Sequence, residues 1–134
     1  MYKKILCVDD DPITLMLCKK VIQKSDFSEI IDIANNGEDA LKYLDAIKNG
    51  HVGDPEFILP ELMFLDLNMP VMGGWEFLDE LTENNYMTHF PNLKVIVLSS
   101  TIDPKDIEKS KSYPMVLDFL SKPITREMLE SLKK

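Results

Sequence analysis

The sequence predicts an α/β protein built on a doubly wound, five-stranded parallel sheet. Two observations lead to this prediction. Five short apolar segments occur along the 134 residues, and each is followed by a stretch with helical periodicity. Apolar residues make up 45% of the chain, which is enough for one sizeable core. Alternating strands and helices are typical of a parallel sheet, because the connecting helices cover both of its faces.

The first half of the chain predicts two strands and two helices. Residues 5–8 and 30–34 are the first two apolar runs, which we interpret as strands. A helix is expected over residues 12–24, because Asp11 is a favourable N-cap residue and a proline suits the first helical turn. The turn residues 35–37 then lead into a second segment with helical spacing.

The second half of the chain repeats this pattern after an irregular segment. The predicted elements are a loop over 50–60, strands over 62–65, 95–98 and 116–120, and helices around 77–81, from 104 to about 113 and from 125 to about 132.

Polar side chains follow the predicted strands at the point where each strand ends. Asp9 and Asp10 follow the first strand, Asp66 the third, Ser99 the fourth, and Lys122 comes just after the fifth. Ligands of open α/β sheets bind outside the carboxyl ends of the strands. We therefore expect three carboxylates, a hydroxyl group and an ammonium group to meet at one edge of the sheet.

Three carboxylates in one pocket repel one another and need positive charge nearby. Two unit charges about 4 Å apart interact by roughly 4 kcal/mol at an effective dielectric constant near 20. Lys122 can neutralise one charge, and Mg²⁺, which prefers oxygen ligands, can neutralise the others. A carboxylate beside Mg²⁺ is a candidate nucleophile, with Mg²⁺, Lys122 and the Ser99 hydroxyl available to the oxygens of a phosphoryl group. The residues thus predict a phosphoryl-acceptor site.

Four segments with these residues resemble one known family. They are VDDD at 8–11, FLDLNMPVMGG at 64–74, VIVLSS at 95–100 and FLSKP at 119–123. In this order and spacing they are similar to the CheY-like receiver domain of response regulators in two-component signalling, over essentially the whole chain. The resemblance implies a flavodoxin-like three-layer sandwich with strand order 2-1-3-4-5, and a cis peptide bond between Lys122 and Pro123.

The resemblance also implies which residues bind the metal and the phosphoryl group. Asp66 would be the phosphoacceptor and a metal ligand. Asp10 would bind Mg²⁺ directly, Asp9 through water, and the backbone carbonyl of Asn68 would be a further ligand, with Mn²⁺ as an alternative cation. Lys122 would pair with the phosphoryl group.

Three further roles follow from the same resemblance. Ser99 would form a hydrogen bond with the phosphoryl group and act with Phe119 as the conformational switch. Serine and phenylalanine stand here where threonine and tyrosine are common in the family. Asn68 and Thr101, each two residues past a site residue, would influence the rate of hydrolysis.

The function implied is a stand-alone response regulator, a signalling switch that catalyses only its own phosphorylation and dephosphorylation. A sensor histidine kinase would phosphorylate Asp66, and the change at the last strand and the helices around 103–133 would control protein–protein contacts. A single receiver domain over 1–134 is expected, without an output domain. An alternative partner is a histidine phosphotransfer protein in a phosphorelay. The oligomeric state stays open between a monomer and a weak homodimer.

Other functions agree less well with the residues. A phosphohydrolase of the haloacid-dehalogenase type carries a second aspartate two residues past its nucleophile, and here that residue is Asn68. A flavodoxin-like redox protein needs a phosphate-binding loop after the first strand, where three aspartates would repel the cofactor. A degenerate receiver that works without phosphorylation is disfavoured by the intact acidic residues and lysine.

Charge and targeting signals narrow the setting. There are 23 acidic and 15 basic residues, a net charge of −8, which disfavours binding to nucleic acid or to an anionic membrane. The N-terminal apolar run is too short for a signal peptide, and no run suits a membrane span. We expect a cytoplasmic protein in which Cys7 and Cys18 are free thiols in the core.

Overall fold

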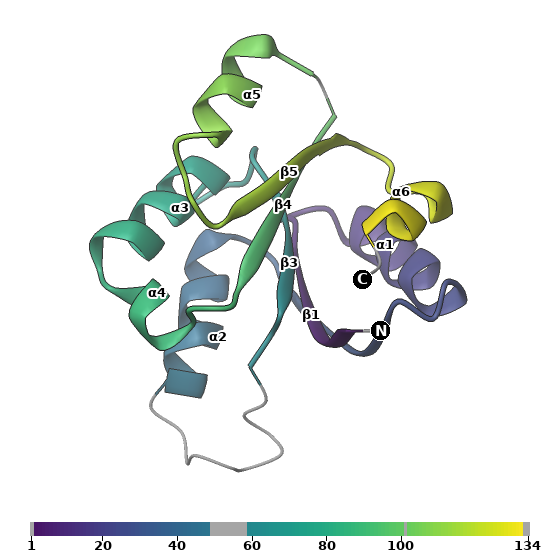
Figure 1. The fold of residues 1–134 in the computed structure, drawn as a ribbon, viewed down its shortest axis with the longest axis horizontal. Helices are drawn as coiled ribbons and strands as arrows, with labels where there is room; N and C mark the ends of the chain where they lie inside the picture. The colour runs from purple at the N-terminus through teal and green to yellow at the C-terminus, as the bar shows by residue number, and fades with distance from the viewer. Residues whose placement is uncertain (1, 49–58, 101, 133–134) are drawn as a thin grey trace.

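A computed structural model describes residues 2–48, 59–100 and 102–132, and it places a parallel sheet between two layers of helices (Figure 1). The strand order is β2-β1-β3-β4-β5, as the family resemblance implies, and every neighbouring pair is parallel. The strands are β1 (Tyr2–Val8), β2 (Ser28–Ala34), β3 (Leu62–Asp66), β4 (Lys94–Ser99) and β5 (Val116–Ser121).

The helices divide between the two faces of the sheet. In Figure 1, α1 and α6 cover one face, and the other four helices lie on the opposite side. The helices are α1 (Pro12–Lys24), α2 (Gly37–Lys48), α3 (Gly74–Glu83), α4 (Tyr86–His89), α5 (Pro104–Ser110) and α6 (Arg126–Leu132). None of them, among the residues that the structure describes, is long and apolar enough to cross a membrane.

Each face of the sheet has its own hydrophobic core. Successive strand residues point to opposite faces, so Cys7 and Phe64 belong to the core under α1 and α6, whereas Val8 and Leu65 belong to the core under α2 and α3. Every residue of β3 is buried, as expected for a central strand covered on both faces. The doubly wound prediction is therefore confirmed.

The strands are longer than their apolar runs. β1 and β2 begin at Tyr2 and Ser28, before the predicted residues 5 and 30, and three strands continue through Asp66, Ser99 and Ser121. The parallel pairing holds there, with Asp66 opposite Leu98 and Ser99 opposite Ser121. The hydrogen bonds between neighbouring strands join backbone groups, so they also form at polar residues. The apolar pattern therefore underestimates the length of the strands.

Three predicted helix starts are confirmed by side-chain capping bonds. The Asp11 carboxylate accepts a 2.9 Å hydrogen bond from the backbone N–H of Ile13 at the start of α1. Asp103 accepts one of 2.9 Å from Lys105 in α5. Thr125 accepts one of 3.2 Å from Met128 in α6.

One helix was not predicted. The sequence pattern predicts one helix between β3 and β4, and the structure has a second, α4, which spans only Tyr86–His89. Four residues are too few to show helical periodicity. The Tyr86 hydroxyl donates a 2.7 Å hydrogen bond to Asp45, which fastens this short helix to α2. The expected loop over 50–60 lies almost wholly outside the described residues.

Candidate functional site

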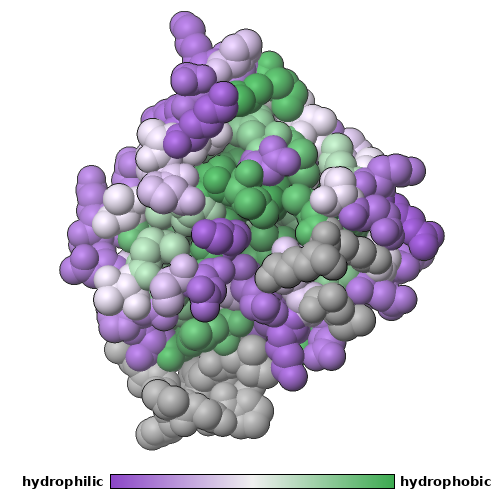
Figure 2. Space-filling view, in the orientation of Figure 1, coloured by the Kyte–Doolittle hydropathy of each residue, from purple (hydrophilic) through white to green (hydrophobic). Residues whose placement is uncertain are grey.

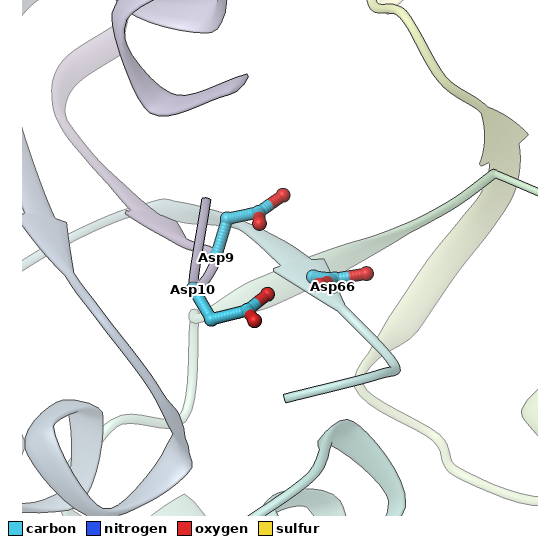
Figure 3. A group of neighbouring side chains, drawn as sticks. All are labelled: Asp9, Asp10 and Asp66. Atoms are coloured by element: carbon cyan, nitrogen blue, oxygen red, sulfur yellow. The ribbon is translucent and has the colours of Figure 1, made fainter. Parts of the chain in front are cut away.

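Three carboxylates meet at the carboxyl edge of the sheet. Asp9 and Asp10 come from the loop after β1 and Asp66 from the last position of β3, and oxygens of all three lie within 4.8 Å of one another (Figure 3). Asp9 and Asp66 are buried, whereas Asp10 is exposed. The predicted convergence of the three carboxylates is therefore confirmed.

Lys122 bridges the two buried carboxylates from the far end of the sequence. Its Nζ lies 2.6 Å from Asp9 Oδ2 and 3.1 Å from Asp66 Oδ1. The backbone N–H of Lys122 donates a 2.8 Å hydrogen bond to the Ser99 carbonyl, which continues the contact of β5 with β4 and aims the lysine at the cluster. The Lys122–Pro123 peptide bond is cis, as the resemblance implies.

The cluster carries more negative than positive charge. Burial, and then the negative charge of Asp9, raise the pKa of Asp66 despite the opposing contacts with Lys122. Burial alone would lower the pKa of Lys122, but its hydrogen bonds to Asp9 and Asp66 outweigh this and raise it. One ammonium among three carboxylates leaves a net negative site.

This donor set fits a hard divalent cation. The three side chains present only oxygen atoms, and Mg²⁺ is usually held by one or two carboxylates together with waters. A cation at the cluster would also relieve the repulsion that raises the Asp66 pKa. Asp9, Asp10 and Asp66 are thus the residues that could hold the metal.

The third consecutive aspartate has a different task. Asp11 is exposed, and its carboxylate accepts hydrogen bonds from the Ile13 N–H and the Thr14 hydroxyl at the start of α1. The first of these bonds is the main reason that the pKa of Asp11 is lowered. The Asp11 N–H donates a 3.0 Å hydrogen bond to Asp9 Oδ1, so the helix cap also positions a cluster carboxylate.

The remaining predicted residues lie around this edge. Ser99 is buried at the end of β4, one residue past the partner of Asp66. Asn68 is exposed, and its N–H approaches Asp66 Oδ1 at 3.5 Å; metal binding by its carbonyl stays a prediction. Phe119 is half-buried against the core, opposite Val97, and its switch role also stays a prediction. Thr101 lies outside the described residues.

Gly74 helps to form the site, whereas the sequence pattern predicts only a turn at this residue. A Cβ atom on Gly74 would lie 2.7 Å from the Asp66 carbonyl oxygen and 2.9 Å from Leu67 Cα. The Gly74 N–H donates a 3.0 Å hydrogen bond to the Leu67 carbonyl. The glycine lets α3 begin directly against the end of β3, and the Gly73-Gly74 pair is the only sequence signal of this contact.

Comparisons with known proteins agree on one family. The family model described as response regulator receiver domain matches residues 5–133. The chain is 30% identical over 132 residues to the chemotaxis protein CheY of Listeria monocytogenes, a match that covers 98% of this chain and 96% of that protein. It is 32% identical over 123 residues to a protein-glutamate methylesterase/protein-glutamine glutaminase of Halalkalibacterium halodurans, covering 90% of this chain but only 30% of that protein.

A solved structure shows the same fold over nearly the whole chain. The two-component response regulator from Cytophaga hutchinsonii superposes with a TM-score of 0.86 at 27% sequence identity. The superposition covers 98% of this chain and 93% of that one.

Proposed function

We propose, because the chain belongs to the response regulator receiver domain family, that it is a phosphorylation-dependent signalling switch with Asp66 as its phosphoacceptor. The observation that carries this proposal is the cluster of Asp9, Asp10 and Asp66 with Lys122 at the carboxyl edge of the sheet. Asp66 lies at the end of the central strand β3, where its burial and the negative charge of Asp9 raise its pKa.

The phosphoryl donor in the proposal is a phosphohistidine of a sensor kinase. A carboxylate oxygen of Asp66 attacks the phosphorus atom, the bond between phosphorus and the donor histidine nitrogen breaks, and the nitrogen keeps the electron pair. Lys122, already 3.1 Å from Asp66 Oδ1, orients this carboxylate and offers a positive charge to the phosphoryl oxygens. The chain would in this way catalyse its own phosphorylation.

Mg²⁺, with Mn²⁺ as an alternative, is the cofactor that we infer. Asp9, Asp10, Asp66 and the carbonyl of Asn68 would hold it. When bound, the cation supplies positive charge to the oxygens of the phosphoryl group. Asp9 and Lys122 pair at 2.6 Å, which keeps this buried carboxylate in place before any cation binds.

The signal would pass from Asp66 to the face formed by α5, β5 and α6. The added negative charge draws the Ser99 hydroxyl toward Asp66 and shifts a pre-existing equilibrium in which Phe119 takes part. Figure 2 shows apolar surface in the middle of the view, in the region of β5. Leu117 of β5 is 54% exposed, and Ile102 before α5 is 51% exposed. Such a face suits recognition by a partner protein, either a downstream target or a histidine phosphotransfer protein.

Intact mass after incubation with acetyl phosphate and Mg²⁺ tests the proposal. We expect one phosphoryl adduct, which disappears without Mg²⁺ and in Asp66→Asn. Asp11→Asn is the matched control, because it makes the same charge change two residues from Asp9 while asparagine still caps α1. An adduct that persists in Asp66→Asn, or none in the wild type, would contradict the assignment. Continued release of phosphate from an ester substrate would instead indicate a phosphohydrolase.

A further inference from the structure

Two thiols lie in contact next to the acidic cluster, and the proposed phosphotransfer uses neither. Cys7 Sγ in β1 is 3.7 Å from Cys18 Sγ in α1, and both cysteines are free and buried. We propose that this pair is a redox modification site, at which a hydroperoxide joins Cys7 and Cys18 in a disulfide that weakens cation binding at Asp9 and Asp10.

The distance between the two sulfur atoms favours this bond. The two sulfur atoms are already at contact distance, and a disulfide needs them to approach by about 1.6 Å further, to about 2.05 Å. The residues belong to the same core cluster, between the sheet and α1. The bond would close a short segment, residues 7–18, that is already folded back on itself by α1.

An oxidant can reach the pair from one side. Cys18 lines an open pocket of about 250 Å³ whose wall also includes Leu17 of α1 and the segment Lys122–Ile124. Cys7 lies deeper, and it shares with Cys18 the wall of a much smaller cavity of about 10 Å³. A hydroperoxide that enters the open pocket therefore meets Cys18 first, with Cys7 directly behind it.

The reaction takes two steps and balances in atoms and electrons. The Cys18 sulfur attacks hydrogen peroxide and breaks the O–O bond, which yields a sulfenic acid on Cys18 and one water. The Cys7 sulfur then attacks the Cys18 sulfur and expels the hydroxyl group, which leaves with the Cys7 proton as a second water. The two thiols together lose two electrons and two protons, and the peroxide is reduced to two waters.

The disulfide acts on the metal site through the start of α1. β1 is held between two neighbouring strands, so α1 is the element that moves when the sulfurs approach. Asp11 caps α1 and holds Asp9 Oδ1 through its N–H at 3.0 Å, and Asp9 is only two residues past Cys7. Loss of such outer contacts typically weakens metal binding by 10–100-fold, and we expect about tenfold. The covalent step stands independently, whereas its effect on the cation rests on the proposed function.

The covalent step is tested by counting reactive thiols. The full chain is reduced, treated with hydrogen peroxide, unfolded, and alkylated. We expect no alkylated cysteine and no dimer after peroxide, and two alkylated cysteines without it. The count is the readout because eight methionines can also gain oxygen. Cys7→Ala should trap a sulfenic acid on Cys18, whereas Cys18→Ala should leave Cys7 unmodified. Two alkylated cysteines in peroxide-treated wild type would overturn the proposal.

The effect on the site is tested by calorimetric titration with Mg²⁺. The oxidised chain should bind Mg²⁺ about tenfold more weakly than the reduced chain, and dithiothreitol should restore the affinity. Cys18→Ala treated with peroxide should bind as the reduced wild type does, which separates the disulfide from methionine oxidation. Equal affinity of the oxidised and reduced chains would overturn the link to the metal site. If the reduced chain takes no phosphoryl group from acetyl phosphate, the proposed function fails while the thiol count still decides the disulfide.

Discussion

Asp66 carries its charge in surroundings that disfavour it. Burial of the side chain and the negative charge of Asp9 raise the pKa of Asp66, and Lys122, which is shared between the two carboxylates, opposes this only in part. A carboxyl group in this state gains from anything that reduces its negative charge, whether a proton or a nearby cation. The same electrostatic repulsion therefore favours cation binding at Asp66 and lowers the stability of the folded protein when no cation is bound.

Asp66→Asn should therefore stabilise the protein at pH 7 without divalent cations. A carboxyl group whose folded pKa exceeds its unfolded pKa contributes stability at low pH and loses it as the pH rises through the folded pKa. Asparagine removes the ionised form, so we expect a melting temperature higher by roughly 2–4 °C at pH 7. The difference should shrink as the pH falls and wild-type Asp66 becomes protonated. Thermal denaturation of both proteins in a chelating buffer over a pH series measures this difference. A lower melting temperature of Asp66→Asn than of the wild type at pH 7 would contradict this account.

The residues of the site were predictable because chemistry limits the choices. Carboxylates, hydroxyl groups and a lysine follow four of the five strands, and their convergence could be predicted from the order of the elements alone. The different task of Asp11 was also foreseen, since an aspartate before a proline is a typical helix start. The contact between Cys7 and Cys18 was not, because nothing in an apolar strand and a helix 11 residues away fixes how they pack.

At the scale of elements, the site depends on the close contact between the end of β3 and the start of α3. Gly74 lies against the backbone of Asp66 and Leu67, so the position of the proposed phosphoacceptor depends on the start of a helix. Sequence patterns predicted both elements, but not the closeness of their joint, since a glycine in a turn has several explanations. The extra helix α4 and the true strand ends escaped prediction because neither depends on apolar periodicity.

Gly74→Ala should disturb this joint. The added methyl group meets two backbone atoms that cannot rotate away, so we expect a loss of about 1–3 kcal/mol in the free energy of unfolding. Phosphorylation of Asp66 should also slow, because the backbone at Asp66 has to shift. Gly73→Ala is the matched control: its Cβ would lie 3.1 Å from the Leu67 carbonyl, and a smaller loss is expected. Urea denaturation measures the free energy of unfolding of both variants. Equal losses in Gly74→Ala and Gly73→Ala would count against the role of Gly74.

At the scale of the whole molecule, the sheet joins residues that are far apart in the chain. Asp9 and Lys122 are 113 positions apart, yet they form the shortest ion pair of the site. The unfolded chain has no such arrangement of carboxylates. A cation that binds the folded site should therefore stabilise the complete fold.

Mg²⁺ should raise the free energy of unfolding with the logarithm of its concentration, once that concentration exceeds the dissociation constant. At a concentration one hundred times its dissociation constant, the gain is about 2.7 kcal/mol. Asp10→Asn should reduce this gain, because Asp10 is the exposed carboxylate of the cluster, whereas Asp11→Asn should retain it. Thermal unfolding across a Mg²⁺ series gives the comparison. Equal gains in Asp10→Asn and the wild type would show that the cation binds elsewhere.

The contact between Lys122 and Asp9 also has a consequence during protein synthesis. β5 and Lys122 are the last part of the site to leave the ribosome, and a domain generally folds as a unit. The three carboxylates and their lysine therefore come together only after β5 has been translated. A chain interrupted before β5 would lack both an edge strand of the sheet and the ammonium group of the site.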